Sequence, residues 1–213
     1  MDTLIIHSIK MPKPMPPETN RKGAKGGRAT RSEIVAAADR LIYESGYGDT
    51  SFSDIADAVG MSRGNFYYHF RTKDAILDAV IDERQAATRA MLEGWAAEAD
   101  DPIARICAFI RILIVNGEKI REHGCPVGTL CNELAKLDHN AFPGAVEIFA
   151  QFRDWLTERF TELGRGEEAQ GLALRVLAFS QGAATLYTAF RDDTWVATEV
   201  DRMCAWVHEL AAQ

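Results

Sequence analysis

Residues 50–70 have the sequence TSFSDIADAVGMSRGNFYYHF, which predicts two short helices joined by a tight turn. Ser51 followed by Asp54 is an N-terminal capping pattern, because the hydroxyl and the carboxylate can satisfy backbone N–H groups that lack a helical partner. Gly60 supplies a residue that leaves the first helix with positive φ. One face of that helix is apolar at helical spacing, through Phe52, Ile55, Ala56 and Val59.

The second short helix is expected to begin after Ser62, a further capping candidate. Phe66 and Phe70, four residues apart, direct its apolar side back at the first helix. The outer face is then left with Arg63, Gly64, Asn65, Tyr67, Tyr68 and His69. Side chains that donate to base edges and phosphates, on a helix whose apolar side is already used, predict a major-groove reader. The alternative is a small helical packing unit with a polar outside.

The flanking residues extend this pattern. An amphipathic helix precedes it and ends near Gly46, and Thr72 caps a long helix with Lys73 in its first turn. The run from Thr30 to Val80 contains GYGDTS, DIA and MSRGNFYYHF, followed by that lysine. This run, about a quarter of the chain, resembles the DNA-binding domain of the TetR (tetracycline repressor-like) family. The resemblance implies a ligand-responsive repressor whose effector enters a second domain and shifts the long helix.

We call the two short helices at residues 51–70 the reading unit. The roles of the residues in and around it follow from side-chain chemistry. Arg63 is the first candidate for base readout, because a guanidinium can bind guanine O6 and N7 in a fork. Asn65 can also read a base edge, and Gly64 lets the backbone approach closely. Phosphate contacts are expected from Thr50, Ser51, Tyr67, Tyr68, His69 and Lys73. Arg28 and Arg31, at the boundary of the preceding helix, are further phosphate candidates.

The charge distribution supports this interpretation. The chain carries −7 overall, yet residues 1–75 hold eleven Lys/Arg and nine Asp/Glu, so the excess of acid lies in the remainder. Residues 1–27 are expected to form a flexible basic arm that adds salt-sensitive, sequence-independent affinity for DNA. A solvated tail without that role is the alternative. Two further units are predicted: a DNA-binding domain over 28–88, with its reading motif at 51–70, and a helical ligand-binding and dimerisation domain over 89–213.

Composition limits the other classes of protein to which the chain could belong. The content of 47% hydrophobic and 26% charged residues fits a globular chain with a real core. Ile103–Val115 comes closest to a membrane span, but Arg105 and Arg111 interrupt it, and the opening residues lack a secretory leader. Four cysteines without paired spacing fit a reducing compartment. A soluble, cytoplasmic protein without membrane partner is therefore expected.

Helical periodicity continues to the C-terminus, so the predicted fold class is all-α with about nine helices. A helix is expected from Lys73 into the Trp95 region, and others from Pro102, over Leu130–Leu137 and from Pro143 to Leu163. The last two are expected at 167–190 and 194–212. Both are rich in apolar residues, and TetR-like proteins dimerise through their last two helices. The resemblance thus implies a homodimer on an inverted-repeat, double-stranded DNA operator.

Evidence for catalysis is lacking. The sequence has no Gly-x-Ser-x-Gly, no phosphate-binding glycine loop and no His-Glu-x-x-His motif, and its five histidines are scattered. We therefore expect no catalytic residue, no metal and no cofactor. Cys125, ahead of a predicted helix, is a candidate for a reactive thiol that senses electrophiles or oxidants. The alternative for Cys125 is a small buried hydrophobe.

The small-molecule effector has no identity at this stage. Candidates for its contacts are Trp95, Phe109, Asn116, Cys125, Phe149 and Phe152, although aromatic residues at helical spacing equally fit a plain core. Two rival classes remain open. One is a helical small-molecule-binding protein or enzyme without DNA function, and the other is a non-specific nucleic-acid-coating protein.

Overall fold

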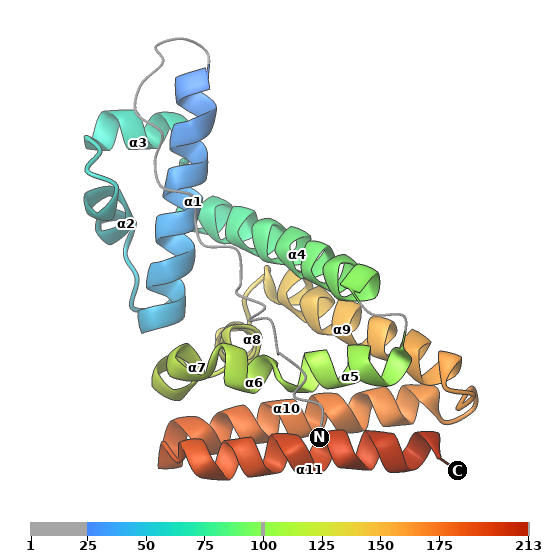
Figure 1. Ribbon diagram of the computed structural model, residues 1–213. Coiled ribbons are helices and arrows are strands. Elements are labelled where there is room, and N and C mark those ends of the chain that lie inside the picture. Colours follow the sequence, from blue (N-terminus) through green and yellow to red (C-terminus); the bar gives the residue numbers. More distant parts are fainter. Residues whose placement is uncertain (1–24, 99–100, 213) are drawn as a thin grey trace.

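The computed structural model describes residues 25–98 and 101–212, and these residues form eleven α-helices and no strand (Figure 1). The helices are α1 (Lys25–Ser45), α2 (Phe52–Ala58), α3 (Arg63–His69), α4 (Lys73–Glu98), α5 (Pro102–Ile110), α6 (Ile112–Val115), α7 (Gly117–His123), α8 (Pro126–Lys136), α9 (Phe142–Glu162), α10 (Ala169–Phe190) and α11 (Asp193–Ala211). The predicted all-α class is confirmed. Of the predicted basic arm, residues 1–24 lie outside the described residues, and 25–27 belong to the first turn of α1.

The caps predicted around α2 are present. The Ser51 side chain accepts the Asp54 N–H at 3.1 Å, and the Asp54 carboxylate accepts the Ser51 N–H at 2.8 Å. These two bonds satisfy orphan donors at the helix start. Gly60 follows with φ of 65°, and Gly46, after α1, has φ of 90°. Because L side chains rarely adopt such angles, glycine is required for both turns.

Two differences from the predicted helices lie between residues 101 and 137. The helix that begins at Pro102 is broken at Arg111 and Asn116 into α5, α6 and α7, which accounts for eleven helices in the described ranges rather than about nine. The two breaks flank the run Ile112–Val115, which forms only the four-residue helix α6 and whose β-branched residues have low helix propensity. Helix α8 begins at Pro126 rather than Leu130, because proline fits a first helical turn and the Cys125 sulfur accepts the Gly128 N–H.

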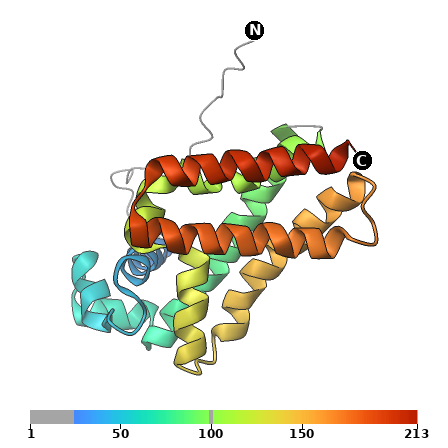
Figure 2. The ribbon, with the colours of Figure 1, turned by 90° about the horizontal axis from the view of Figure 1, so that it is seen from below.

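The arrangement of the helices separates the short α2 and α3 from the final pair. In Figure 1, α1, α2 and α3 stand at one end of the molecule, and α4 runs from them toward α9. Helices α10 and α11 lie side by side and antiparallel at the opposite end. Seen from below in Figure 2, this pair lies in front of the rest of the chain. One long side of α10 and α11 is therefore not covered by the other helices of the described residues.

Buried apolar residues form two clusters. The first, here the N-terminal core, joins α1–α4 and includes Ile34, Ile55, Phe66, Ile76 and Leu77, none of which is exposed to solvent. It also takes in five residues beyond position 88, which are Leu130, Cys131, Leu134, Ala141 and Ala145. The second, the C-terminal core, joins α4–α7 and α9–α11. Val127 and Phe149 pack against both cores, so the two parts of the chain share packing at α8 and α9.

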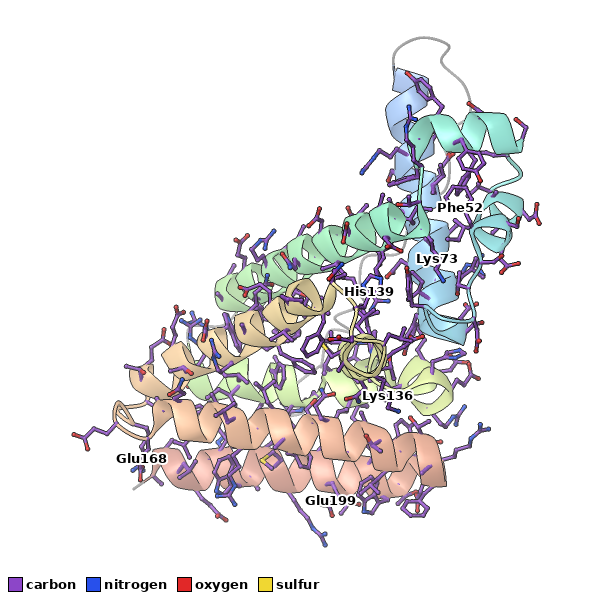
Figure 3. The ribbon with its side chains drawn as sticks, turned by 180° about the vertical axis from the view of Figure 1, so that it is seen from behind. Phe52, Lys73, Lys136, His139, Glu168 and Glu199 are labelled. Atoms are coloured by element: carbon purple, nitrogen blue, oxygen red, sulfur yellow. The ribbon has the colours of Figure 1, made fainter. Side chains whose placement is uncertain are left out.

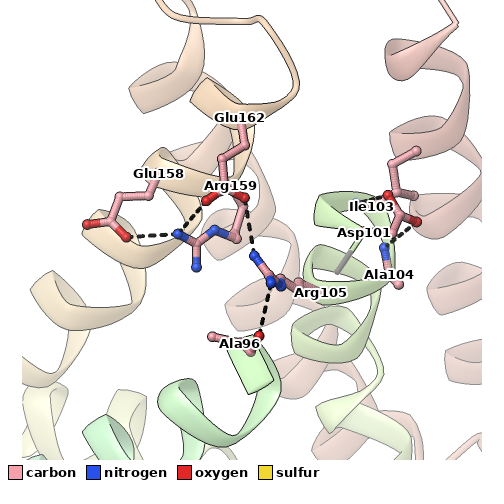
Figure 4. A network of polar contacts seen from close by, with 8 residues as sticks. All are labelled: Ala96, Asp101, Ile103, Ala104, Arg105, Glu158, Arg159 and Glu162. Atoms are coloured by element: carbon pink, nitrogen blue, oxygen red, sulfur yellow. Dashed lines mark hydrogen bonds and ion pairs between the residues drawn. The ribbon is translucent and has the colours of Figure 1, made fainter. Parts of the chain in front are cut away.

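A polar network ties α5 and α9 together (Figure 4). The Glu162 carboxylate forms ion pairs with Arg159 at 2.8 Å and with Arg105 at 3.4 Å. Arg105 also donates to the Ala96 carbonyl at 2.9 Å. Because Arg159 is buried, its charge needs the partners that Glu162 and Glu158 provide. Within the described ranges, no helix is long and apolar enough to cross a membrane.

Candidate nucleic-acid interface and effector pocket

Helix α3 is held to the N-terminal core by its phenylalanines. Phe66 is fully buried and Phe70 is 3% exposed, and the Phe66 ring meets the Phe52 ring edge-on at 4.7 Å. The opposite face points to solvent, with Gly64 and Asn65 exposed, Tyr67 52% exposed and Tyr68 84% exposed. Within the described residues, the Tyr68 hydroxyl makes no hydrogen bond, whereas the Tyr67 ring stacks on Phe52 at 4.9 Å. The predicted division into an apolar inner face and a polar outer face is present.

Other predicted contact residues surround α3. His69 is half-buried and meets the Tyr68 ring edge-on at 5.3 Å. Arg31, exposed on α1, places its guanidinium 4.6 Å from the centre of the Phe70 ring. Arg63 begins α3 and Arg28 lies in the first turns of α1, and for both the structure describes the backbone but not the side chain. These positions bring basic and aromatic residues of α1 and α3 to one end of the molecule.

Thr50 is not placed to make the phosphate contact that was predicted for it. Its side chain is only 2% exposed, and its hydroxyl donates to the Gly46 carbonyl at 2.7 Å. The hydroxyl therefore closes the loop between α1 and α2 and does not reach the surface. Its neighbour Ser51 is exposed, but its oxygen caps α2, so only its hydroxyl hydrogen remains for an external acceptor.

Lys73 has a structural contact that sequence reasoning did not anticipate. Its ammonium donates to the Tyr47 carbonyl at 2.8 Å and lies 4.0 Å from the centre of the Tyr47 ring. The Tyr47 hydroxyl in turn donates to Asp74, and Tyr47 packs edge-on against His139 at 5.0 Å. Burial, followed by the bond to Asp74, raises the pKa of Tyr47 above its ordinary value. Figure 3 shows Lys73 and His139 where the start of α4 meets the α8–α9 connection.

The predicted effector contacts separate into two groups. Trp95, Phe109 and Phe152 are 6%, 3% and 7% exposed and belong to the C-terminal core, where the rings of Phe109 and Phe152 lie 5.3 Å apart. They are plain core, because close-packed rings leave no room for a ligand. Asn116 is half-buried between α6 and α7. The packing gives these four positions no support as effector contacts, and their assignment stays a prediction.

Cys125 and Phe149 do line a pocket, with a volume of about 540 Å³. Its wall is shared by α8 and α10, through Gly128, Thr129, Asn132, Gln181, Thr185 and Thr188. Gln181 donates to the Cys125 sulfur at 3.4 Å, and a Cβ added at Gly128 would collide with the Gln181 side-chain oxygen. The sequence gives no signal for Gln181, because it stands 56 positions from Cys125 and is brought there only by the packing of α10.

The other cysteines are poor candidates for chemistry with an external reagent. Cys107, Cys131 and Cys204 are buried, whereas Cys125 is half-buried. Burial raises the pKa of Cys131 to about 11. A hydrogen bond with Cys204 raises the pKa of Cys107. Among the described residues, no cluster of three or more His, Cys, Asp or Glu side chains is placed to hold a metal ion.

The fold and the site together define a helix-turn-helix protein. Two short helices are joined by a tight turn, the second has an exposed polar face, and the remaining helices contain a pocket. The family model for bacterial regulatory proteins of the tetR family matches residues 34–80. An uncharacterised HTH-type transcriptional regulator from the lacX 3' region of Lactococcus lactis subsp. lactis is 30% identical over 169 residues, 78% of this chain and 86% of that protein. The HTH-type transcriptional repressor DhaR of Mycobacterium sp. (strain GP1) is 25% identical over 123 residues, 57% of this chain and 61% of that protein.

Solved structures share the fold. A TetR transcriptional regulator from Legionella pneumophila superimposes with a TM-score of 0.73 at 22% identity, covering 90% of this chain and 98% of that one. The chain therefore belongs to the TetR family, and it is a DNA-binding transcriptional regulator rather than an enzyme.

Proposed function

We propose that this regulator is a cytoplasmic repressor that binds an inverted-repeat operator as a homodimer and leaves it when a small molecule enters the pocket beside Cys125. The observation that carries the proposal is the division of α3. Its phenylalanine side is fully used by the N-terminal core, while Asn65, Tyr67 and Tyr68 face solvent with polar groups that internal packing does not need. Polar groups on the exposed face of the second helix are suited to base edges and phosphates.

Gly64 supports the assignment independently. A Cβ added there would meet nothing within 4 Å, so the fold of the single subunit does not require glycine at this position. Glycine inside a helix costs roughly 0.5–1 kcal/mol relative to alanine. A glycine that internal packing does not explain, on the exposed face of α3, fits a surface where an external backbone approaches closely. The sugar-phosphate backbone of a duplex is such a surface.

The proposed roles of the contact residues follow their positions. Arg63 and Asn65 read base edges at the start of α3. Ser51, Tyr67, Tyr68, His69, Arg28 and Arg31 bind phosphates, as does Lys73. Only one of the three ammonium N–H groups of Lys73 is donated to Tyr47, so two remain for a phosphate at the start of α4.

Dimerisation through α10 and α11 is supported by the uncovered side of α10. Leu174, Leu186 and Phe190 are 51%, 41% and 71% exposed, although large apolar residues are normally buried. The same helix exposes three small residues, Ala178, Gly182 and Ala189. Small side chains at these positions allow another helix to approach closely. A two-fold dimer built on this face places two α3 helices about 34–36 Å apart, one turn of B-DNA.

The test is a selection of duplexes from a random library by the purified protein, followed by footprinting and a mass measurement in solution. We expect an inverted repeat with half-sites about one helical turn apart, bound by a dimer. Arg63→Ala should relax specificity at one base position and cost roughly 1–3 kcal/mol, whereas Lys119→Ala, at an exposed lysine on α7, should leave binding unchanged. A monomer, or equal affinity for all duplexes, contradicts the proposal.

A second candidate mode of release is favoured by the surroundings of Cys125. Its sulfur receives the Gly128 N–H at 3.5 Å and the Gln181 amide at 3.4 Å, at the start of α8 and inside an open pocket. Cys125 is half-buried rather than buried, so a reagent that enters the pocket can reach its sulfur. Under this mode, quinones or peroxide release the DNA and Cys125→Ser abolishes the response. Release that persists in Cys125→Ser rules out the thiol as the sensor.

A further inference from the structure

The loop between α1 and α2 is held by a residue of α8. The Glu133 carboxylate accepts the Tyr47 N–H at 2.8 Å and the Gly48 N–H at 2.7 Å. A Cβ at Gly46 or Gly48 would stand 3.1 or 3.3 Å from a Glu133 oxygen, so both glycines make room for this carboxylate. We call the two bonds from the Tyr47–Gly48 loop to Glu133 the Glu133 clasp. It satisfies two backbone donors that no helix serves.

The clasped loop leads directly into the reading unit. Tyr47 is fixed at all three of its polar groups, since its carbonyl accepts from Lys73 and its hydroxyl donates to Asp74. Thr50 then closes the loop onto Gly46, immediately before the capping box of α2. A displacement of Glu133 is therefore passed to the starts of α2 and α4 together.

An adjoining face of α8 forms the pocket, because Thr129, which lines it, stands four residues before Glu133. Cys125, Gly128, Thr129 and Asn132 line it at helical spacing, while Leu130 and Leu134 are buried in the N-terminal core. Two further bonds fix the start of α8 to α1 and α4, from Tyr43 to the Gly124 carbonyl at 2.8 Å and from Arg84 to the Pro126 carbonyl at 2.7 Å. In Figure 1, α8 lies between the level of α1 and that of α10. One rigid helix thus contacts both the pocket and the clasp.

We propose that Glu133 is the positioning residue through which occupancy of the Cys125 pocket reaches the DNA-reading helices. An occupant that displaces Gln181 from Cys125 moves the start of α8, and the clasp converts that movement into a shift of the Tyr47–Gly48 loop. The inference rests on the proposed function, because it assumes operator binding by α3. It adds a defined route between two sites that sequence alone places in separate domains.

Covalent labelling provides an occupant of known identity. N-ethylmaleimide adds the Cys125 sulfur across its double bond, the thiol proton passing to the adjacent carbon, so that one compact ring stands in the pocket. The other three cysteines are buried, and mass spectrometry of the intact protein and its peptides confirms a single adduct. Affinity for the selected duplex is then measured for labelled and unlabelled full-length protein, with far-UV circular dichroism to confirm folding.

In the wild type, the adduct should weaken DNA binding by about 5- to 150-fold, the usual range for coupled sites. In Glu133→Gln the adduct should change affinity less than about threefold, because an amide offers one acceptor and turns a donor toward the second backbone N–H. Glu118→Gln, an exposed glutamate on α7, removes the same charge outside the clasp and should respond like the wild type. Gly48→Ala, which presses on Glu133 without removing it, is the second variant if Glu133→Gln does not fold.

The outcomes separate the two proposals. If no unlabelled protein binds any duplex, the proposed function fails. If the wild type binds DNA but the adduct leaves its affinity unchanged, or Cys125 takes no adduct, the pocket does not communicate and the inference is overturned. An equal response in the wild type and in Glu133→Gln shows that the signal travels by another route and overturns it too. Cys125→Ser, treated identically, reports any effect of the reagent elsewhere.

Discussion

Three consecutive residues of α3 should separate folding from DNA binding. Phe66 is fully buried, so Phe66→Ala should lower the free energy of unfolding by about 3–5 kcal/mol through lost burial and a cavity. Tyr67 is 52% exposed and stacks on Phe52, so Tyr67→Ala should cost about 0.5–1.5 kcal/mol. Tyr68 is 84% exposed and its ring stands perpendicular to the His69 ring at 5.3 Å, so Tyr68→Ala should stay within about 0.5 kcal/mol of the wild type.

DNA affinity should follow a different order. If the Tyr68 hydroxyl donates to a phosphate, its loss removes a hydrogen bond to a charged group, about 1.5–3 kcal/mol per half-site, or roughly ten- to hundred-fold in affinity. Tyr68→Phe keeps the ring and removes only this bond, so it should show most of the same loss. Urea unfolding followed by circular dichroism gives stability, and fluorescence anisotropy on the selected duplex gives affinity for the folded fraction.

Two results would refute this reasoning. A loss of more than about 1 kcal/mol of stability in Tyr68→Ala would show that the residue packs against its own chain after all. Wild-type affinity in Tyr68→Ala and Tyr68→Phe would show that the most exposed aromatic residue of α3 does not meet the duplex. The second result would leave Arg63 and Asn65 to carry the interface.

Lys73→Ala should weaken binding to all duplexes and flatten the salt dependence of that binding by about one unit of slope, as a titration over salt would show. It should also destabilise the fold by about 1–2 kcal/mol through the lost bond to Tyr47, as urea unfolding would show. Burial raises the pKa of Tyr43 to about 12 in the folded protein. The neutral Tyr43 hydroxyl therefore contributes fully to the free energy of unfolding below the pKa of the unfolded chain, near 10, and this contribution is lost as pH rises toward 12. The wild type should therefore lose roughly 1–2 kcal/mol more than Tyr43→Phe between pH 9 and pH 12 in urea unfolding, after allowance for solvent at this half-buried ring. Leu186→Glu should convert the dimer to monomer in analytical ultracentrifugation with little change in helicity, and a dimer that persists would place the interface elsewhere.

The reading unit could be predicted from sequence because its determinants are local. The capping pattern of Ser51 with Asp54, the glycine turn and the spacing of Phe66 and Phe70 each involve residues within four positions of one another. Thr50 was misassigned for the same reason. A threonine beside a helix start looks accessible, and only the fold of the loop shows its hydroxyl turned inward to Gly46.

The pocket could not be predicted in the same way. A buried aromatic and a pocket-lining aromatic have the same spacing on a helix, so Phe152 and Phe149 are indistinguishable in sequence, although the first lies in the C-terminal core and the second lines the pocket. What separates them is the neighbour across the helix interface. For Cys125 that neighbour is Gln181, and for the loop at Tyr47 it is Glu133, 86 positions away.

The same long-range packing bears on where one part of the chain ends and the other begins. The sequence predicts a boundary near residue 88, yet Leu130 and Leu134 of α8 are buried in the N-terminal core. A helix that contributes to one core and lines a pocket beside the other cannot move without changing the packing of both. Close-packed interiors respond to such a movement by adopting a second arrangement rather than by deforming continuously. The residues that set the response to an occupant should therefore lie on α8 itself. This is why a substitution at Glu133, which neither lines the Cys125 pocket nor lies on α3, is expected to uncouple the pocket from the duplex.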